Sequence, residues 1–255
     1  MGIGSKETNK EIMQAWEIVS DVLKLVSGAA QPGMTTLELN DIGEKRVLEL
    51  GGTPYNKGYH PQFAKTPFPF AMCIGVNNQL AHGFPSDYKL QEGDLVSFDL
   101  GVKKDDVCGD GALTIGIGAI SNKDERLLYY ARKTLEEGIK VIKAGIQTKE
   151  IAKAMETYAG LRGYVINHNF SGHAIGKEMH EDPMIPHVTL PGFGEEALKE
   201  GQMICLEPIL TYKDKMGRPT ENGWTWETRD GKKSAIFEKQ ILVKKDGYEI
   251  LTTHF

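Results

Sequence analysis

The chain has 255 residues, of which 40% are hydrophobic and 25% are charged, with a formal net charge of -5. This length and composition fit a globular protein with a sizeable core, built as one large α/β domain or two small ones. Because the sequence has no basic excess, general nucleic-acid binding is not expected, although a local basic patch stays open.

The cysteine pattern and the N-terminus bear on the compartment. Cys73, Cys108 and Cys205 are an odd number, widely spaced and without a CxxC pair, so neither a disulfide framework nor a structural zinc site is indicated. The first ten residues contain no apolar region, and no run of about 18 apolar residues occurs in the chain. We therefore expect a cytoplasmic protein without signal peptide or membrane span.

Helix signals come in two pairs along the chain. Capping-box signatures at Thr8 with Glu11 and at Thr35 with Glu38 precede apolar residues at helical spacing. The helices are expected from residue 8 to about 32, 35 to about 51, 121 to about 143, and 148 to about 163. Strands are expected at 72–76, 96–102, 107 onward, 164–167, 203–211 and 235–243. Residues 53–72 are predicted to form an ordered loop.

The stretch from Val96 to Gly118 predicts a hairpin with the polar turn at residues 103–106. If its loop has an even number of residues centred between Lys104 and Asp105, Asp99 lies opposite Asp110. Two carboxylates so close repel each other unless they share a proton or bind a cation. The alternative is a solvent-facing strand from which the two aspartates diverge.

Two short matches indicate an internal duplication. Residues 33–39 resemble residues 145–151, and residues 92–99 resemble residues 200–207. The second match places Glu207 where Asp99 stands in the first half. The alternative to duplication is that the matches arise by chance, because helices and strands have similar sequence patterns in any protein. We expect a single domain over residues 1–255, with pseudo-repeats at about 8–118 and 121–255.

A second acidic hairpin is expected to pair Glu207 with Glu238, because both lie among apolar strand residues where an unpaired charge is rarely tolerated. With Asp99 and Asp110 they would bring four negative charges to one site, which two divalent cations would neutralise. His173, between glycines, is a plausible nitrogen ligand. This donor set suits Mn, Fe, Co or Zn better than Ca, and a metal pair suits hydrolysis.

Two further histidines, His82 and His180, lie in predicted loops. Either they are solvated or structurally bonded, or they lie near the metals and stabilise an oxyanion or a leaving nitrogen. Other catalytic motifs are absent from the sequence: an HExxH motif would need histidine at Met184, and a GxSxG motif would need glycine at Asn169.

The series Asp99, Asp110, His173, Glu207 and Glu238 resembles the five-ligand dinuclear metal set of type I methionine aminopeptidases, which are pita-bread metallopeptidases. The likeness covers nearly the whole chain. It implies an α/β (α+β) pita-bread fold, with pseudo-twofold halves and a central antiparallel sheet covered by helices. It also implies two divalent metal ions (Co, Mn, Fe or Zn) and removal of the initiator methionine from nascent chains when the second residue is small.

The resemblance also implies individual roles. Asp99 would ligate one metal, His173 and Glu207 the other, and Asp110 and Glu238 would bridge them. Glu207 would be the general base. The substrate carbonyl and the tetrahedral intermediate would be held by His82 and His180, and the methionine pocket would be lined by Cys73, Trp224 and Met179.

The sequence departs from that family at three positions that are not ligands. These are Gly111, where a hydroxyl residue is common, Lys239, where histidine is common, and Asn78, where an acid is common. Because residues around the ligands influence metal affinity and activity, these departures are expected to alter both. Residues 60–70 fit the family's loop poorly, which leaves the wall of the methionine pocket open.

The expected partners are nascent polypeptide N-termini, at the ribosome, with the enzyme acting as a monomer without membrane or direct nucleic-acid contact. One alternative is a proline-specific pita-bread peptidase, although those usually carry an additional N-terminal domain. Another is a non-catalytic binding protein on the same scaffold, although such proteins typically lose metal ligands.

Overall fold

The computed structural model describes residues 13–62 and 64–253. The helices are α1 (Ala15–Ala29), α2 (Thr36–Glu49), α3 (Asn122–Lys140) and α4 (Thr148–Leu161). The strands of the first part are β1 (Thr53–Pro54), β2 (Cys73–Val76), β3 (Gln79–Ala81), β4 (Leu95–Lys104) and β5 (Val107–Gly116). The later strands are β6 (Val165–Ile166), β7 (Gly172–Ala174), β8 (Glu181–Ile185), β9 (Met203–Leu206), β10 (Ile209–Thr211), β11 (Arg218–Pro219), β12 (Trp226–Glu227), β13 (Ser234–Ile236), β14 (Lys239–Lys244) and β15 (Gly247–Ile250).

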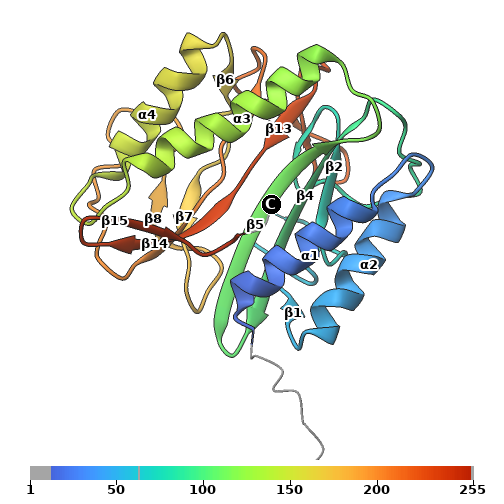
Figure 1. Cartoon of the computed structure of the whole chain (residues 1–255), viewed down its shortest axis with the longest axis horizontal. Coiled ribbons are helices and arrows are strands. Elements are labelled where there is room, and N and C mark those ends of the chain that lie inside the picture. The colour runs from blue at the N-terminus through green and yellow to red at the C-terminus, as the bar shows by residue number, and fades with distance from the viewer. Residues whose placement is uncertain (1–12, 63, 254–255) are drawn as a thin grey trace, which may run out of the picture.

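Antiparallel strands form the centre of the molecule, and helices cover them. The strand β4 pairs with β1, β2 and β5, while a second sheet has the order β15-β14-β9-β7-β8. Helix α1 packs on β4 and β5, and α3 packs on β10 and β13 (Figure 1). Within the described residues, no helix has the length and apolarity that crossing a bilayer requires.

The first hairpin separates an apolar face from a polar one. Val96, Phe98 and Leu100 of β4 are fully buried in the main core, which they share with the apolar face of α1. Since side chains of a strand alternate between its two faces, Asp99 points to the side away from α1. The alternation of β4 therefore gives the helix one face and leaves the other face for Asp99.

The predicted register of this hairpin was wrong, because the turn lies one residue later in the sequence than expected. The loop has two residues, Asp105 and Asp106, with φ of 50° and 61°, as a type I′ turn requires. Its centre lies one residue later than expected, so Asp99 pairs with Ala112 and Asp110 pairs with Gly101. The two aspartates are thus diagonal neighbours on one face instead of direct partners.

The two long strands expected in the second half are each interrupted. One breaks between β9 and β10 at Glu207 and Pro208, and the other breaks between β13 and β14 at Phe237 and Glu238. Proline has no N–H to donate to a ladder. The N–H of Glu207 donates instead to His187 Nε2, and that of Glu238 donates to the carbonyl of Ala112 in β5.

The register is nevertheless continuous across both breaks. Leu206 pairs with Lys239 on one side, and Ile209 pairs with Ile236 on the other. Glu207 therefore lies opposite Glu238, as the sequence predicted.

Helices α2, α3 and α4 agree with their predicted bounds within three residues, whereas α1, which was expected from residue 8, begins at Ala15. Thr35 and Glu38 form the expected capping box of α2. The capping box of α1 is formed by Gln14 and Glu17, and the box expected at residues 8 and 11 lies outside the described residues. Helices α1 and α3 end about three residues before the expected positions.

Equivalent backbone contacts occur in the two parts of the chain. Gly33 N–H donates to the carbonyl of Leu90, and Gly145 N–H donates to that of Leu198, both at 2.8 Å. Isolated bridges join Thr35 to Lys89 and Gln147 to Ala197. The two sequence matches thus correspond to two copies of one local arrangement, in which the start of the second helix contacts the segment before the hairpin strand.

Close packing of α1 on the hairpin depends on Gly109 of β5. A Cβ at this position would lie 2.5 Å from the backbone carbonyl carbon of Ala15 and 2.5 Å from the nitrogen of Trp16. Because these are helix backbone atoms, α1 would have to move. We expect Gly109→Ala to lower the free energy of unfolding by about 1–3 kcal/mol, measured by urea denaturation.

A matched control is Gly160→Ala in α4, where an added Cβ would meet no atom within 4 Å. Because alanine favours helix over glycine, this variant is expected to be as stable as the parent or more stable by about 1 kcal/mol. Equal unfolding midpoints for Gly109→Ala and the parent protein would show that this contact does not limit stability.

Candidate metal centre

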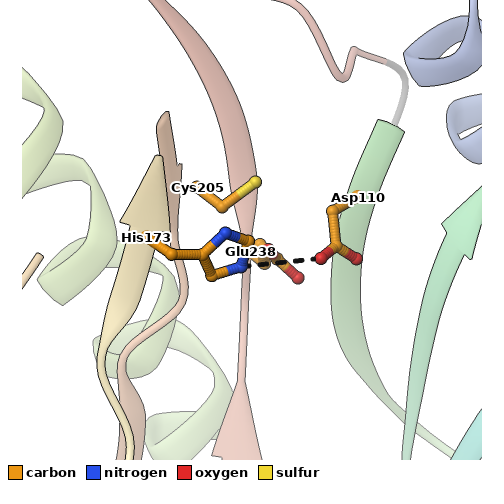
Figure 2. Close-up of side chains that lie close together, drawn as sticks. All are labelled: Asp110, His173, Cys205 and Glu238. Carbon is orange, nitrogen blue, oxygen red and sulfur yellow. Dashed lines mark ion pairs between the residues drawn. The ribbon is translucent and has the colours of Figure 1, made fainter. Parts of the chain in front are cut away.

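Five polar side chains from separate strands line one pocket of about 330 Å³. Asp99 comes from β4, Asp110 from β5, His173 from β7, and Glu207 and Glu238 from the two strand breaks. Figure 2 shows Asp110, His173 and Glu238 directed toward a common space, together with Cys205. All four carboxylates of the sequence prediction and the expected histidine are therefore in one place.

The imidazole of His173 faces the carboxylates with one nitrogen. Its Nε2 lies 3.7 Å from Asp110 Oδ2 and 3.7 Å from Glu207 Oε1 (Figure 2 draws the first pair). Its Nδ1 lies 3.0 Å from the carbonyl oxygen of Ala174. Because a carbonyl only accepts, Nδ1 carries the proton, and Nε2 presents a lone pair to the pocket. Burial lowers the pKa of His173 to about 3, so the ring is neutral.

Burial and mutual repulsion favour protonation of the four carboxylates. Burial raises the pKa of Asp99 to about 7. Burial and the charge of Asp99 raise the pKa of Asp110 well above its usual range. Burial and the neighbouring acids also raise the pKa of Glu207 and of Glu238. Each of these groups carries its charge at neutral pH only at a free-energy cost.

Divalent cations fit this donor set. Among the described residues, those that line the pocket include no lysine or arginine. Glu238 is 2% exposed, and its Oε1 has no hydrogen-bond partner among the described residues. A buried carboxylate oxygen without a donor is rare unless it binds an ion. Four carboxylates and one neutral imidazole match the ligands of Mn, Fe, Co or Zn.

Beside the carboxylates, the pocket contains the two other predicted histidines. His180 Nδ1 lies 3.3 Å from the hydroxyl oxygen of Tyr59, and the rings of His180 and His173 are 4.5 Å apart. His82 has a φ of 52°, and its Nδ1 is buried without a hydrogen-bond partner among the described residues. Burial lowers the pKa of His82 to about 4 and also lowers the pKa of His180. Both are neutral imidazoles at the site.

An aromatic wall closes the other side of the pocket. Phe68 packs edge-on against Trp224, with ring centroids 5.2 Å apart, and both cluster with Cys73. Met179 also lines the pocket. Phe68 therefore forms part of this wall. It comes from the segment whose contribution to the methionine pocket the sequence left open. Cys73, Trp224 and Met179 all line the same pocket as the candidate ligands.

The three departures from the family pattern lie outside the pocket. Gly111 donates its N–H to Asp110 Oδ1 at 2.9 Å, so it holds that carboxylate through the backbone. Lys239 Nζ donates to the carbonyl of Thr252, and Asn78 Nδ2 donates to Glu227 Oε2.

Several residues at the site were not predicted, and three of them contact the predicted residues directly. Cys205 lies within the metal-ligand cluster, His187 accepts the N–H of Glu207, and Asn56 accepts the N–H of Gly101 while donating to Cys73 Sγ. Burial raises the pKa of the Cys205 thiol well above its ordinary value. Cys205 lies two positions before Glu207 and so points to the same face, but a cysteine in an apolar strand cannot be told from a small core residue by its sequence. His187 and Asn56 carry no local pattern.

Known proteins are similar in sequence to this chain over nearly its whole length. Residues 10–245 match metallopeptidase family M24. The methionine aminopeptidase of Clostridium perfringens is 35% identical over 253 residues, covering 99% of each chain. The methionine aminopeptidase of Helicobacter pylori strain 26695 is 34% identical over 255 residues, covering 99% of this chain and 98% of the relative.

Solved structures agree with this relation. The methionine aminopeptidases of Rickettsia prowazekii and Thermotoga maritima both superpose with a TM-score of 0.88, at 30% and 32% identity, covering 94% of each chain. The prolidase of Pyrococcus furiosus, at 23% identity and a TM-score of 0.72, shares the fold alone. The expected pita-bread fold is confirmed.

The chain therefore belongs to metallopeptidase family M24, a class of metal-dependent hydrolases. Its relatives within that family, over nearly the full length, are methionine aminopeptidases, as the resemblance implied.

Proposed function

We propose that this protein removes the initiator methionine from nascent polypeptides when the second residue is small. The observation that carries the proposal is one pocket lined by every predicted site residue: the five candidate ligands, His82, His180, Cys73, Trp224 and Met179. The polar donors occupy one side and the aromatic wall the other. This arrangement suits a substrate with a polar amide next to an apolar, unbranched side chain.

The candidate ligands are Asp99, Asp110, His173, Glu207 and Glu238, and we propose that they hold two divalent ions. When bound, such ions would lower the pKa of a coordinated water and polarise the substrate carbonyl. Glu207, half-buried at the rim of the donor set, is proposed to accept the proton of the attacking water. Its raised pKa in the metal-free protein reflects its burial and, after that, the neighbouring Asp110 and Asp99.

The two neutral imidazoles are proposed to act as hydrogen-bond donors to the reacting amide. When the Tyr59 hydroxyl donates to His180 Nδ1, the Nε2 of His180 carries the proton and donates. A donor aimed at the developing oxyanion stabilises the tetrahedral intermediate without introducing a fixed positive charge beside the metals. His82 is proposed to act in the same way toward the leaving nitrogen.

The methionine side chain is proposed to lie against Cys73, Met179 and Trp224. Sulfur and aromatic groups contact a thioether favourably. Phe68, which packs on Trp224, extends this surface. The pocket of about 330 Å³ is large enough for one residue and the reacting bond, and small for a long side chain at the second position.

Several wider expectations belong to this proposal. We propose that residues 1–255 form one duplicated domain, which is supported by the equivalent contacts of Gly33 with Leu90 and Gly145 with Leu198. We also propose a cytoplasmic monomer that acts on nascent N-termini at the ribosome, with no direct nucleic-acid contact. The family and its chemistry support these statements.

Peptide hydrolysis tests the proposed activity. Purified protein supplied with Mn²⁺ or Co²⁺ is expected to release free methionine from Met-Ala-Ser and to leave Ala-Pro uncut, measured by chromatography of the products. Removal of the metal with a chelator is expected to abolish the release, and resupply is expected to restore it. Hydrolysis of Ala-Pro in preference to Met-Ala-Ser would support a proline-specific peptidase, and no hydrolysis by metal-loaded protein would support a binding protein.

A further inference from the structure

A cysteine thiol lies among the candidate ligands. Cys205 is fully buried in β9, where it pairs with His173 on one side and with Gln240 on the other. One ligand atom each from Cys205, His173, Asp110 and Glu238 lie within 4.8 Å of one another (Figure 2). Since residues two apart in a strand share a face, Cys205 and Glu207 face the same side.

A second observation points to an ion beside this thiol. Glu238 Oε1, in the same group of four, is buried without a hydrogen-bond partner among the described residues. The lone pair of His173 Nε2 faces the same space, because Nδ1 is engaged by the carbonyl of Ala174. Both atoms are acceptors, and a cation satisfies both at once.

The four donors are chemically a set for thiophilic metals. Zinc is bound at about 2.0–2.3 Å by thiolate, imidazole and carboxylate, most often by four ligands in a tetrahedron. The donor atoms of such a tetrahedron are roughly 3.5 Å apart, so the present group would need to contract by about 1 Å. Thiolate selects zinc and similar soft ions over Mn²⁺, which prefers oxygen donors.

We propose that Cys205 is a sixth metal ligand, which acts with Asp110, His173 and Glu238 to hold a thiophilic divalent ion such as Zn²⁺ or Cd²⁺. Binding replaces the S–H bond by a sulfur–metal bond and releases the proton to solvent. The inference depends on the proposed metal centre and extends it, since oxygen-preferring ions would use the carboxylates and the imidazole without the thiol. The chain would thus bind different ions with different ligand sets.

The test is a titration of full-length, chelator-treated protein with Cd²⁺ under reducing conditions, followed by ultraviolet thiolate-to-metal charge-transfer absorption. The parent protein is expected to develop the band with one equivalent of ion. Cys205→Ser is expected to lose it and to show a drop of about 10-fold or more in Cd²⁺ affinity relative to Mn²⁺ affinity. Serine keeps the size and the hydrogen-bonding capacity of the thiol while removing the soft donor.

Two matched controls assign the band. Cys108→Ser removes a buried cysteine whose Sγ donates to the carbonyl of Lys177 and is outside the group of four, so the band should persist. Cys73→Ser tests the cysteine of the aromatic cluster, and the band should persist there too. Cys205→Thr is the replacement variant if Cys205→Ser does not fold, as judged by circular dichroism.

The outcomes separate the two levels of the inference. The absence of a band in the parent protein, or a full band in folded Cys205→Ser or Cys205→Thr, overturns ligation by Cys205. Mass spectrometry of the same samples loaded with Mn²⁺ reports on the metal centre itself. Bound Mn²⁺ without a Cd²⁺ band refutes only the role of Cys205, whereas no bound ion of either kind refutes the proposed centre.

Discussion

Replacement of Glu207 by glutamine is expected to lower kcat for Met-Ala-Ser hydrolysis by about 10²- to 10⁴-fold, the range typical of the loss of a general base. The amide keeps the shape of the side chain and one oxygen, but it has no basic site for the proton of the attacking water. Glu207 Oε1 lies 3.7 Å from His173 Nε2, so the substitution acts at the centre of the donor set. The measurement is initial-rate kinetics at saturating metal.

Metal content must be measured for the same samples, because Glu207 is also a candidate ligand. A loss of kcat in protein that retains its metal supports the role as base, and a loss restored by excess metal supports ligation alone. Glu200→Gln is the matched control, since Glu200 is exposed at the turn before β9. Full activity of Glu207→Gln would contradict the proposed mechanism.

The metal-free protein is expected to lose stability as the pH rises from about 6.5 to 8. The folded pKa of Asp99 is about 7 against an ordinary value of 3.8, and the pKa values of Asp110, Glu207 and Glu238 are raised as well. Below pH 6.5 the buried histidines oppose this trend, because burial lowers the pKa of His173 to about 3 and that of His82 to about 4 from an ordinary value of 6.5. Above pH 6.5 these histidines are largely neutral in both states, so the four acids leave the folded state with more bound protons than the unfolded chain, and the free energy of unfolding falls with pH. A loss on the order of a few kcal/mol corresponds to a Tm lower by about 10 °C.

Bound metal should remove this decline, because ions take the place of the protons on the carboxylates. Differential scanning calorimetry across pH 4–8, with chelator and with Mn²⁺, measures both curves. Asp99→Asn is expected to flatten the curve of the metal-free protein, and Asp246→Asn, an exposed turn residue, is expected to leave it unchanged. A metal-free Tm that rises between about pH 6.5 and 8 would disprove the electrostatic account of the site.

The sequence predicted the faces of the strands better than their registers. Alternation in β4 was enough to place Asp99 away from the core, because a strand has only two faces. The register depended on which residues form the turn. The prediction placed Lys104 inside the turn, whereas in the structure it is the last residue of β4 and pairs with Val107. Asp105 and Asp106 both adopt positive φ, which aspartate tolerates and lysine disfavours. That preference was the signal that would have corrected the register.

The parts of the pocket that were not predicted depend on contacts between distant segments. Phe68 contacts Trp224 across more than 150 residues, and His187 serves the N–H of Glu207 only because the strand breaks there. No local periodicity records such pairs. Glu207 and Glu238 were found because a charge among apolar strand residues is conspicuous by itself, whereas a cysteine such as Cys205 in the same strand looks like any small core residue.

The five candidate ligands are divided unevenly along the chain. Asp99 and Asp110 come before α3, while His173, Glu207 and Glu238 come after it. A crossover between two homologous genes within α3 would exchange the two donor groups as intact blocks. Each chimera would inherit all five ligands. The relative position of the two donor groups would depend on contacts between the two parts of the chain, such as the hydrogen bond from Glu238 N–H to the carbonyl of Ala112. Recombination of this kind would vary the spacing between the ions and leave the chemistry of their ligands unchanged.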